Sequence, residues 1–335
     1  MFRLKDLRIL GSRAELASLP EGKLLINTIN AHSYNTARKD KLFAEALTNG
    51  DVLIPDGVSI VKACRWIKAK SRPQERVAGW DLFEFEMLKL EQLGESLRQL
   101  GVRNFELGVD GLQPFENCSV ENCVDEGSDA DKLGVRNFEL GIDGLQPFES
   151  CSVENCMEEK NTAANSKLRQ DAATNSKLKT QNSKLCEPRK RLTVMFMGSS
   201  QRVLDLIVKR AAEVYPHLRV VTYSPPYKAE FSEEDNRAIV DAINAANPDL
   251  LWIGMTAPKQ EKWTYAHWDE LNIHCHVGTI GAVFDFFAGT VERAPVWWQR
   301  HGLEWLYRLL KEPKRMWRRY IIGNALFLWN IFVHE

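Results

Sequence analysis

A carboxylate stands at the turn that follows an apolar segment near the start of the chain. The stretch LIPDGVSIV (53–61) runs from an expected strand through Asp56 into a helical pattern. Pro before and Gly after an Asp are ordinary turn residues, so the carboxylate has a plain structural explanation. The alternative is that Asp56 faces a cleft at the end of a parallel sheet, where it would accept a proton from a substrate hydroxyl.

Hydrogen-bonding side chains follow the preceding expected strand, KLLINTIN (23–30). Thr28 and Asn30 stand at its end, as Asp56 stands at the end of the next strand. A carboxylate beside two hydrogen-bonding groups is what the activation of a hydroxyl requires. Farther along, the turn at Gly198 and Ser199 precedes a helix and could seat a diphosphate on backbone N–H groups, although any strand-to-helix turn favours small residues.

Strands alternate with helices on both sides of a central segment. The strands are expected at 23–30, 51–54, 191–200, 218–223, 249–258 and 274–280, and the helices at 33–50, 58–69, 80–100, 201–216, 231–248 and 258–271. Ser232 is the expected N-cap of the helix at 231–248. This order predicts a Rossmann-like α/β fold with a mostly parallel sheet flanked by helices. Ligands of such sheets bind outside the carboxyl ends of the strands, where these polar residues fall.

A repeat interrupts this alternation. GVRNFELGVDGLQPFENCSVENC (101–123) recurs at 134–156 with two differences, and NSKL occurs three times in the polar tract that follows. Two copies are too few for a solenoid. The segment is therefore predicted to be a low-complexity, disordered insertion at 101–188, which separates the two core segments 1–100 and 189–290. Its C-x4-C pairs could hold zinc, but free thiols are favoured over a zinc site: Cys118, Cys123, Cys151 and Cys156.

The last segment, 291–335, is basic and rich in Trp. Eight Lys or Arg stand against two Glu between residues 293 and 319, and five of the ten Trp follow residue 290. Such a helical appendage suits an anionic membrane surface. The candidate contact residues are Arg315, Trp317, Arg318 and Arg319. The alternative is a helix that packs on its own domain or on another copy of the chain in a homo-oligomer.

Bulk properties exclude several classes of protein. The net charge of −1 implies no general attraction to nucleic acid. The charged start MFRLKDLRIL is unlike a signal peptide, and no apolar run reaches the ~20 residues that span a bilayer. Seven Cys without a secretion signal indicate a reducing, cytoplasmic setting. Neither a G-x-G-x-x-G nor a P-loop motif is present, and His274 and His276 lack a recognisable third metal ligand.

Several motifs together resemble the WecG/TagA/CpsF family of bacterial glycosyltransferases. They are NTIN (27–30), LIPDG (53–57), RVAGWDL (76–82), NPDLLWIGMTAPKQEKW (247–263) and the tail from FDFFAGTVERAP through GLEWLYRLLKEPKRMWRRY. The resemblance implies an inverting, metal-independent transferase that uses no cofactor. It would move a sugar such as N-acetylmannosamine from a UDP-sugar to an acceptor sugar on a polyprenyl diphosphate, in the synthesis of cell-surface polysaccharide or teichoic-acid-type polymers.

The resemblance also implies roles for particular residues and a place in the cell. Asp56 matches the family's proposed base, and Thr28 and Asn30 match polar residues at its first strand end. Arg76 and Gln260 match substrate-binding positions, and the less favoured alternative for Arg76 is a surface salt bridge. The enzyme would work at the inner face of the plasma membrane as a peripheral protein. Two other classes stay open: an inactive nucleotide-sugar-binding or scaffold protein, and an oxidoreductase, which the missing glycine motif disfavours.

Overall fold

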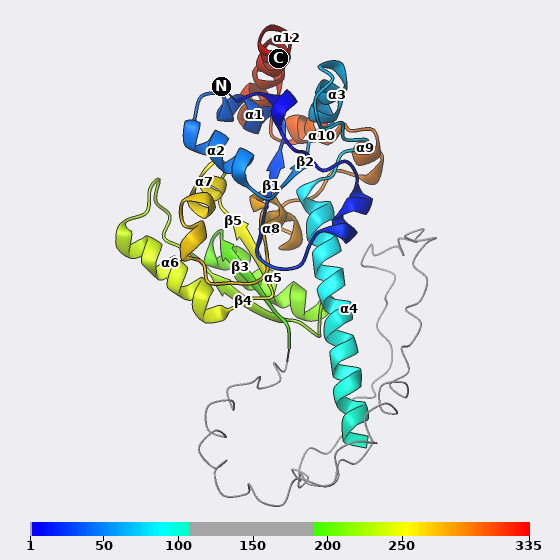
Figure 1. Ribbon diagram of the computed structural model, residues 1–335, viewed down its shortest axis with the longest axis vertical. Helices are drawn as coiled ribbons and strands as arrows, with labels where there is room; N and C mark the ends of the chain where they lie inside the picture. Colours follow the sequence, from blue (N-terminus) through cyan, green and yellow to red (C-terminus); the bar gives the residue numbers. More distant parts are fainter. Residues whose placement is uncertain (1, 107–190) are drawn as a thin grey trace, which may run out of the picture. The chain divides into compact units, whose positions relative to one another are not determined.

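The computed structural model describes residues 2–106 and 191–335, which build a six-stranded sheet with helices on both faces (Figure 1). The strand order is β2-β1-β6-β5-β3-β4, and every neighbouring pair is parallel. The predicted Rossmann-like α/β class is thus confirmed. The strands are β1 (Leu24–Ile29), β2 (Val52–Pro55), β3 (Thr193–Gly198), β4 (Arg219–Tyr223), β5 (Leu250–Gly254) and β6 (His276–Thr279).

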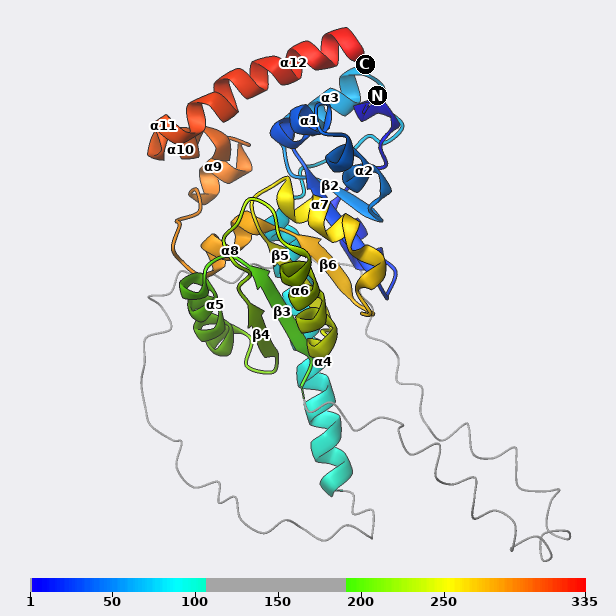
Figure 2. The same cartoon turned by 90° about the vertical axis from the view of Figure 1, so that its left-hand side faces the viewer.

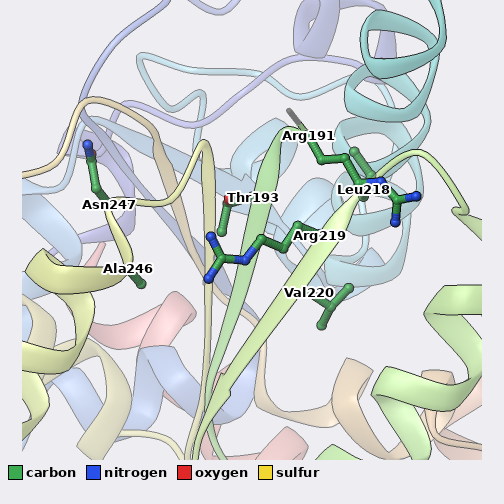
Figure 3. A pocket seen from close by; sticks show the side chains of 7 residues that line it. All are labelled: Arg191, Thr193, Leu218, Arg219, Val220, Ala246 and Asn247. Atoms are coloured by element: carbon green, nitrogen blue, oxygen red, sulfur yellow. The ribbon is translucent and has the colours of Figure 1, made fainter. Parts of the chain in front are cut away.

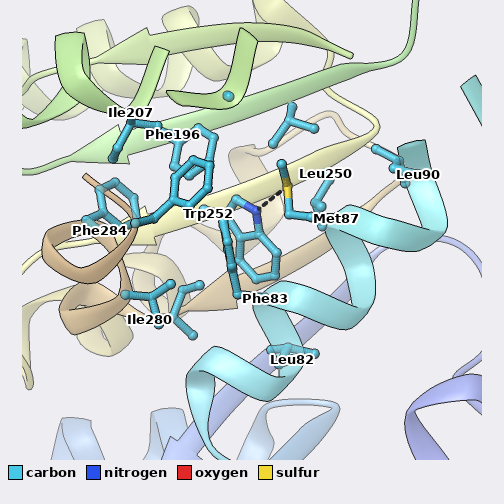
Figure 4. Close-up of a cluster of buried hydrophobic side chains, with 14 of the residues drawn as sticks. Leu82, Phe83, Met87, Leu90, Phe196, Ile207, Leu250, Trp252, Ile280 and Phe284 are labelled. Atoms are coloured by element: carbon cyan, nitrogen blue, oxygen red, sulfur yellow. Dashed lines mark hydrogen bonds between the residues drawn. The ribbon is translucent and has the colours of Figure 1, made fainter. Parts of the chain in front are cut away.

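One face of the sheet packs against α4 (Gly79–Glu106), α5 (Gln201–Val214) and α8 (Gly281–Phe287). Figure 4 shows the aromatic centre of this core, where the Phe83 ring contacts the rings of both Phe196 and Trp252. The indole of Trp252 is fully buried, and its Nε1 donates a hydrogen bond to the sulfur of Met87 at 3.5 Å. Truncating such a residue costs about 3–5 kcal/mol of stability, so this layer fixes the sheet that carries the site.

The opposite face is covered by α1 (Ala31–Ala37), α2 (Lys41–Asn49), α6 (Glu233–Ala246) and α7 (Lys259–Ala266). The single helix predicted at 33–50 is wrong, because α1 ends at Ala37 and Asp40 starts α2 as its N-cap, accepting a hydrogen bond from the Phe43 N–H at 3.0 Å. The predicted N-cap Ser232 is confirmed by its hydrogen bond from Asp235 N–H. The helix predicted at 258–271 ends early, and a 3-10 turn, η5 (Trp268–Glu270), follows it.

The C-terminal helices form a further layer, drawn in orange to red in Figure 2. They are α9 (Val296–Arg300), α10 (Glu304–Lys311), α11 (Pro313–Trp317), the π-helical turn η6 (Arg318–Ile322) and α12 (Gly323–His334). The α12 helix lies beside α1, where Phe327 meets Tyr34 edge-on at 5.3 Å between ring centroids. The Glu335 carboxylate accepts hydrogen bonds from the Tyr34 hydroxyl and the Leu4 N–H. One face of this appendage therefore packs on its own domain.

Three short elements complete the described chain: η1 (Leu4–Asp6), η2 (Arg13–Ser18) and α3 (Val58–Trp66). Helix α4 runs to Glu106, so its last six residues, 101–106, fall inside the predicted insertion. The rest of the first copy, the whole second copy and the four Cys lie outside the described residues, so the insertion and the domain boundaries stay predictions. Within 2–106 and 191–335, no helix combines the length and apolar character that crossing a bilayer demands.

Candidate active site

The turn after β2 presents Asp56 beside the end of β1. The backbone N–H of Asp56 donates a hydrogen bond to the carbonyl of Ile29 at 2.9 Å, which fixes the turn against β1. Asn30, the next residue of that strand end, caps α1 by accepting hydrogen bonds from the N–H groups of His32 and Ser33 at 3.0 and 3.1 Å. Hydrogen bonding with the Asn30 side chain lowers the pKa of the Asp56 carboxyl. Asp56 and Asn30 thus lie together, as the sequence predicted.

The electrostatic environment of Asp56 is mixed. Desolvation is the largest influence and raises the pKa of the carboxyl above its usual range. The positive charges of Arg76 and Arg308 lower this pKa, and the negative charge of Glu304 raises it. A carboxylate whose pKa is raised is a stronger base than a free one, provided that it stays ionised.

Arg76 is held near this turn by the backbone and by an ion pair. Its neighbour Val77 donates an N–H hydrogen bond to the carbonyl of Pro55 at 3.1 Å, directly before Asp56. The Arg76 Nη1 lies 2.8 Å from Oε2 of Glu304 on α10, and the two side chains are only 15% and 13% exposed. The alternative of a surface salt bridge is therefore wrong in one respect: the pair is largely buried and joins the core to the appendage.

Further cationic groups surround the Glu304 carboxylate. Arg308 Nη2 lies 3.6 Å from Oε1 of Glu304, one helical turn away on α10. Arg293 stacks over the Trp80 ring at 5.2 Å, and its Nε is buried without a hydrogen-bond partner among the described residues. Burial lowers the pKa of Arg293, while the charge of Glu304 opposes that shift. We call Arg76, Arg293, Arg308 and Glu304 the arginine cluster.

The sequence patterns did not single out Arg293, Glu304 or Arg308. All three stand in the tail motifs ERAP and GLEWLYRLL, which carry part of the family resemblance. Their basic character was assigned to a membrane surface, because nothing in the local sequence shows that α10 folds back toward the turn after β2. The only available signal was the motif itself.

Thr28 and Asn27 have different surroundings on β1. Thr28 is half-buried and paired in register with Ile54 of β2, two residues before Asp56. Asn27 is fully buried, donates to the Ala46 carbonyl at 3.0 Å and accepts from the Thr279 hydroxyl at 2.8 Å. Of the two, Thr28 remains the candidate that shares the strand-end region with Asp56.

The turns after β3 and β5 form a second region with predicted ligand contacts. Gly198 has φ +120°, and an added Cβ would collide with the Gly254 carbonyl. Ser199 N–H donates to that same carbonyl at 2.8 Å, so these two turns are tied together. No side chain caps the start of α5 at Ser200, which leaves the helix N-terminus without a side-chain acceptor. An anion could occupy that position.

Gln260 is buried, and both ends of its amide are engaged. Its Oε1 accepts from Met255 N–H at 3.1 Å, and its Nε2 donates to Oε1 of Glu261 at 2.9 Å. Burial raises the pKa of Glu261 to about 7. This geometry gives Gln260 a role in ordering the turn after β5, while contact between Gln260 and substrate stays a prediction.

The predicted membrane-contact residues lie on α11 and η6. Arg318 is exposed and stacks over the exposed Trp317 ring at 5.5 Å. Arg319 is half-buried, and its positive charge adds to the desolvation that lowers the pKa of His32 on α1. The side chain of Arg315 lies outside the described residues. Arg319 thus stands closer to the core than a purely peripheral contact would require.

Two other places are set apart from this site. The open hollow in Figure 3 is lined by residues that include Thr193 and Arg219, the first residues of β3 and β4, so it lies at the amino ends of the strands. His276, the first residue of β6, contacts Glu86 and the Pro20 carbonyl through its two ring nitrogens, each at 2.9 Å. It is a buried structural residue. The described residues contain no group of three His, Cys, Asp or Glu arranged to hold a metal ion.

Comparison with known proteins covers most of the described chain. The model of the "Glycosyl transferase WecG/TagA/CpsF family" matches residues 8–104 and 168–335. An N-acetylglucosaminyldiphosphoundecaprenol N-acetyl-beta-D-mannosaminyltransferase of Bacillus spizizenii (strain ATCC 23059 / NRRL B-14472 / W23) is 33% identical over 146 residues, which are 44% of this chain and 54% of the relative. A protein of the same name from Bacillus subtilis (strain 168) is 31% identical over 131 residues, 39% of this chain and 48% of the relative. The chain thus spans about half the length of the curated relatives that it matches.

Proposed function

Because the chain belongs to the WecG/TagA/CpsF family of glycosyltransferases, we propose that it transfers an N-acetylmannosamine-like sugar from a UDP-sugar to an acceptor sugar on a polyprenyl diphosphate. The observation that carries this proposal is the meeting of Asp56 with the arginine cluster at the carboxyl ends of β1 and β2. A base beside a concentration of positive charge suits the displacement of a nucleotide diphosphate by a hydroxyl. The relatives' printed names supply the sugar and the lipid-linked acceptor.

In this proposal Asp56 is the general base. The acceptor hydroxyl attacks the anomeric carbon, the bond to UDP breaks with its electron pair on the departing phosphate, and the hydroxyl proton passes to the Asp56 carboxylate. A carboxylate cannot ionise an alcohol in advance, so the proton moves late, as the new C–O bond forms. A single displacement of this kind inverts the anomeric centre. Asn30 orients the carboxylate, and Thr28 is placed to bind the acceptor.

The departing diphosphate requires positive charge. Arg76 and Arg308 already share one carboxylate, and the Arg293 Nε has no hydrogen-bond partner within 2–106 and 191–335. Arginine binds phosphate oxygens in a bidentate manner and keeps its charge at all working pH values. These residues therefore supply the stabilisation, and the transfer is proposed to proceed without a metal ion. The turn at Gly198 and Ser199 is proposed to bind another part of the donor.

The appendage is proposed to rest on an anionic membrane surface, next to the lipid-borne acceptor. The outward side of η6 and α12 exposes apolar side chains: Ile321, Ile322, Leu328, Trp329, Phe332 and Val333. Trp66 of α3 stacks with Phe332 at 6.3 Å and is 58% exposed, which extends this surface. Arg318 adds positive charge at its edge. Amphipathic surfaces of this composition bind the headgroup region.

Purified protein tests the proposal when it is incubated with a panel of UDP-sugars and a short-chain polyprenyl diphosphate–GlcNAc. The expected result is UDP release matched by a lipid product that has gained one sugar, with UDP-N-acetylmannosamine as the preferred donor and no loss of rate in EDTA. Tight UDP binding without transfer from any donor would instead favour the scaffold alternative.

A further inference from the structure

Glu304 is the one carboxylate of the described chain that contacts both Arg76 and Arg308, at 2.8 and 3.6 Å. The glycosyl transfer proposed above requires cations and a base at this position but assigns no task to an extra negative charge. Its side chain is 13% exposed, so it is held in the site and does not extend into solvent. A buried carboxylate that competes with a diphosphate for arginines calls for an explanation.

Local packing shows why Glu304 occupies this place. The turn before α10 contains Gly302 at φ +68°, and a Cβ there would stand 2.8 Å from Cγ2 of Val58. Val58 is the first residue of α3 and follows Asp56 by two positions. The appendage thus approaches the turn at Asp56, which we call the catalytic turn, in two ways. The backbone at Gly302 lies close to Val58, and Glu304 pairs with Arg76, whose neighbour Val77 hydrogen-bonds Pro55.

We infer that Glu304 is a positioning residue, which holds the arginines in place before the donor arrives and sets the basicity of Asp56. Without its charge, three guanidinium groups would repel one another beside Asp56. With the Glu304 charge present, the Arg76 guanidinium keeps one orientation and is held partly away from Asp56. This inference rests on the proposed transferase function and deepens it.

The charged groups around Asp56 and Glu304 determine the direction in which the pKa of Asp56 should change. Asp56 is influenced by Arg76, Arg308 and Glu304, and Glu304 by Arg76, Arg308 and Arg293. Replacing Glu304 with Gln removes a negative neighbour and frees Arg76 to pair with Asp56. Both changes lower the pKa of Asp56. The base then stays ionised to lower pH but accepts a proton less readily.

The test compares Glu304→Gln with the wild type in the transfer assay across pH 4–9. We expect kcat to fall roughly 10-fold or more and the acid limb of kcat/KM to move to lower pH, with UDP binding retained. Glu304→Asp, which keeps the charge, should restore the position of the acid limb. Glu292→Gln is the matched control, since Glu292 is 82% exposed and its partner Lys311 lies on the same helix as Glu304. An unmoved acid limb in Glu304→Gln, or an equal shift in Glu292→Gln, would overturn the inference.

Hydrogen exchange without any substrate separates this inference from the proposed function. If Glu304 holds α10 against the catalytic turn, amides of 304–311 should exchange faster in Glu304→Gln than in the wild type and in Glu292→Gln. Unchanged protection of α10 would contradict the positioning role whether or not transfer is detected. Absent transfer with faster exchange would leave the positioning role supported and remove the transferase function.

Discussion

The two ends of the predicted ligand-binding edge are built in different ways. After β1 and β2, charged side chains from distant segments meet, with Arg76 and Glu304 separated by 228 positions in the chain. After β3 and β5, the polar groups are largely occupied in ordering the two turns: Ser199 N–H donates to the Gly254 carbonyl, and the Gln260 amide bonds Met255 and Glu261. A polar residue at a strand end is therefore a stronger functional candidate when the hydrogen bonds that order the turn do not already occupy its polar group.

Removing Arg76 should have the largest effect on function. Arg76→Gln is expected to lower turnover about 100-fold and to weaken UDP binding, the usual scale for losing a group that stabilises developing charge. Arg219→Gln, in the hollow at the amino ends of the strands, should leave both unchanged. Steady-state kinetics and calorimetric UDP titration measure the two effects. Equal losses in the two variants would mean that the carboxyl-end location is wrong.

Replacing Gly198 should lower the stability of the fold more than the rate of transfer, which sharpens the contrast between the two ends of the sheet edge. Gly198→Ala is expected to cost about 3 kcal/mol, because it combines a left-handed backbone with a collision against Gly254. Gly22→Ala is the control, since Gly22 has φ +111° but nothing within 4 Å of an added Cβ, so only the backbone strain of about 1 kcal/mol applies. Urea denaturation compares the two variants, and equal midpoints would refute the collision.

Much of the fold followed from the sequence, because parallel strands buried on both faces read as apolar runs between amphipathic helices. The proximity of Asp56 and Asn30 followed as well, since adjacent parallel strands bring their carboxyl ends together. The break at Asp40 was missed because an N-cap inside a helical pattern looks like one more polar residue. The arginine cluster was missed for another reason: its long-range ion pairs depend on how α10 returns to the core, which no local period encodes.

Substitutions on the appendage should distinguish its part in membrane binding from its part in catalysis. Replacing Trp329 and Phe332 together with Ser is expected to reduce partition onto anionic liposomes at least about 10-fold, given ~1.5–3 kcal/mol for each large apolar side chain. Val214→Ser, at an exposed apolar position on α5, should not change it. Co-sedimentation at rising salt measures both. A change of oligomeric state with unchanged liposome binding would assign this surface to an interface between copies of the chain.

The smallest expected effect concerns Glu261, which belongs to the turn after β5. Its pKa is about 7 in the folded protein, against an ordinary value of 4.5. The folded state therefore binds more protons than the unfolded chain between these values, and stability falls as pH rises through this window. Glu261→Gln should remove that loss, so its Tm should exceed the wild-type Tm by several °C at pH 8, and the two should converge at pH 4.5 and below. A Tm difference between Glu261→Gln and the wild type that stays constant across this pH range would contradict a buried, neutral Glu261.

The central claim is that Asp56 is the base of a glycosyl transfer, and Asp56→Asn tests it most directly. The substitution preserves shape and removes the proton acceptor. Single-turnover transfer from UDP-N-acetylmannosamine to polyprenyl diphosphate–GlcNAc should slow at least ~100-fold, while the Kd for UDP stays within about twofold of the wild type. Near-normal transfer by Asp56→Asn would remove Asp56 from the mechanism.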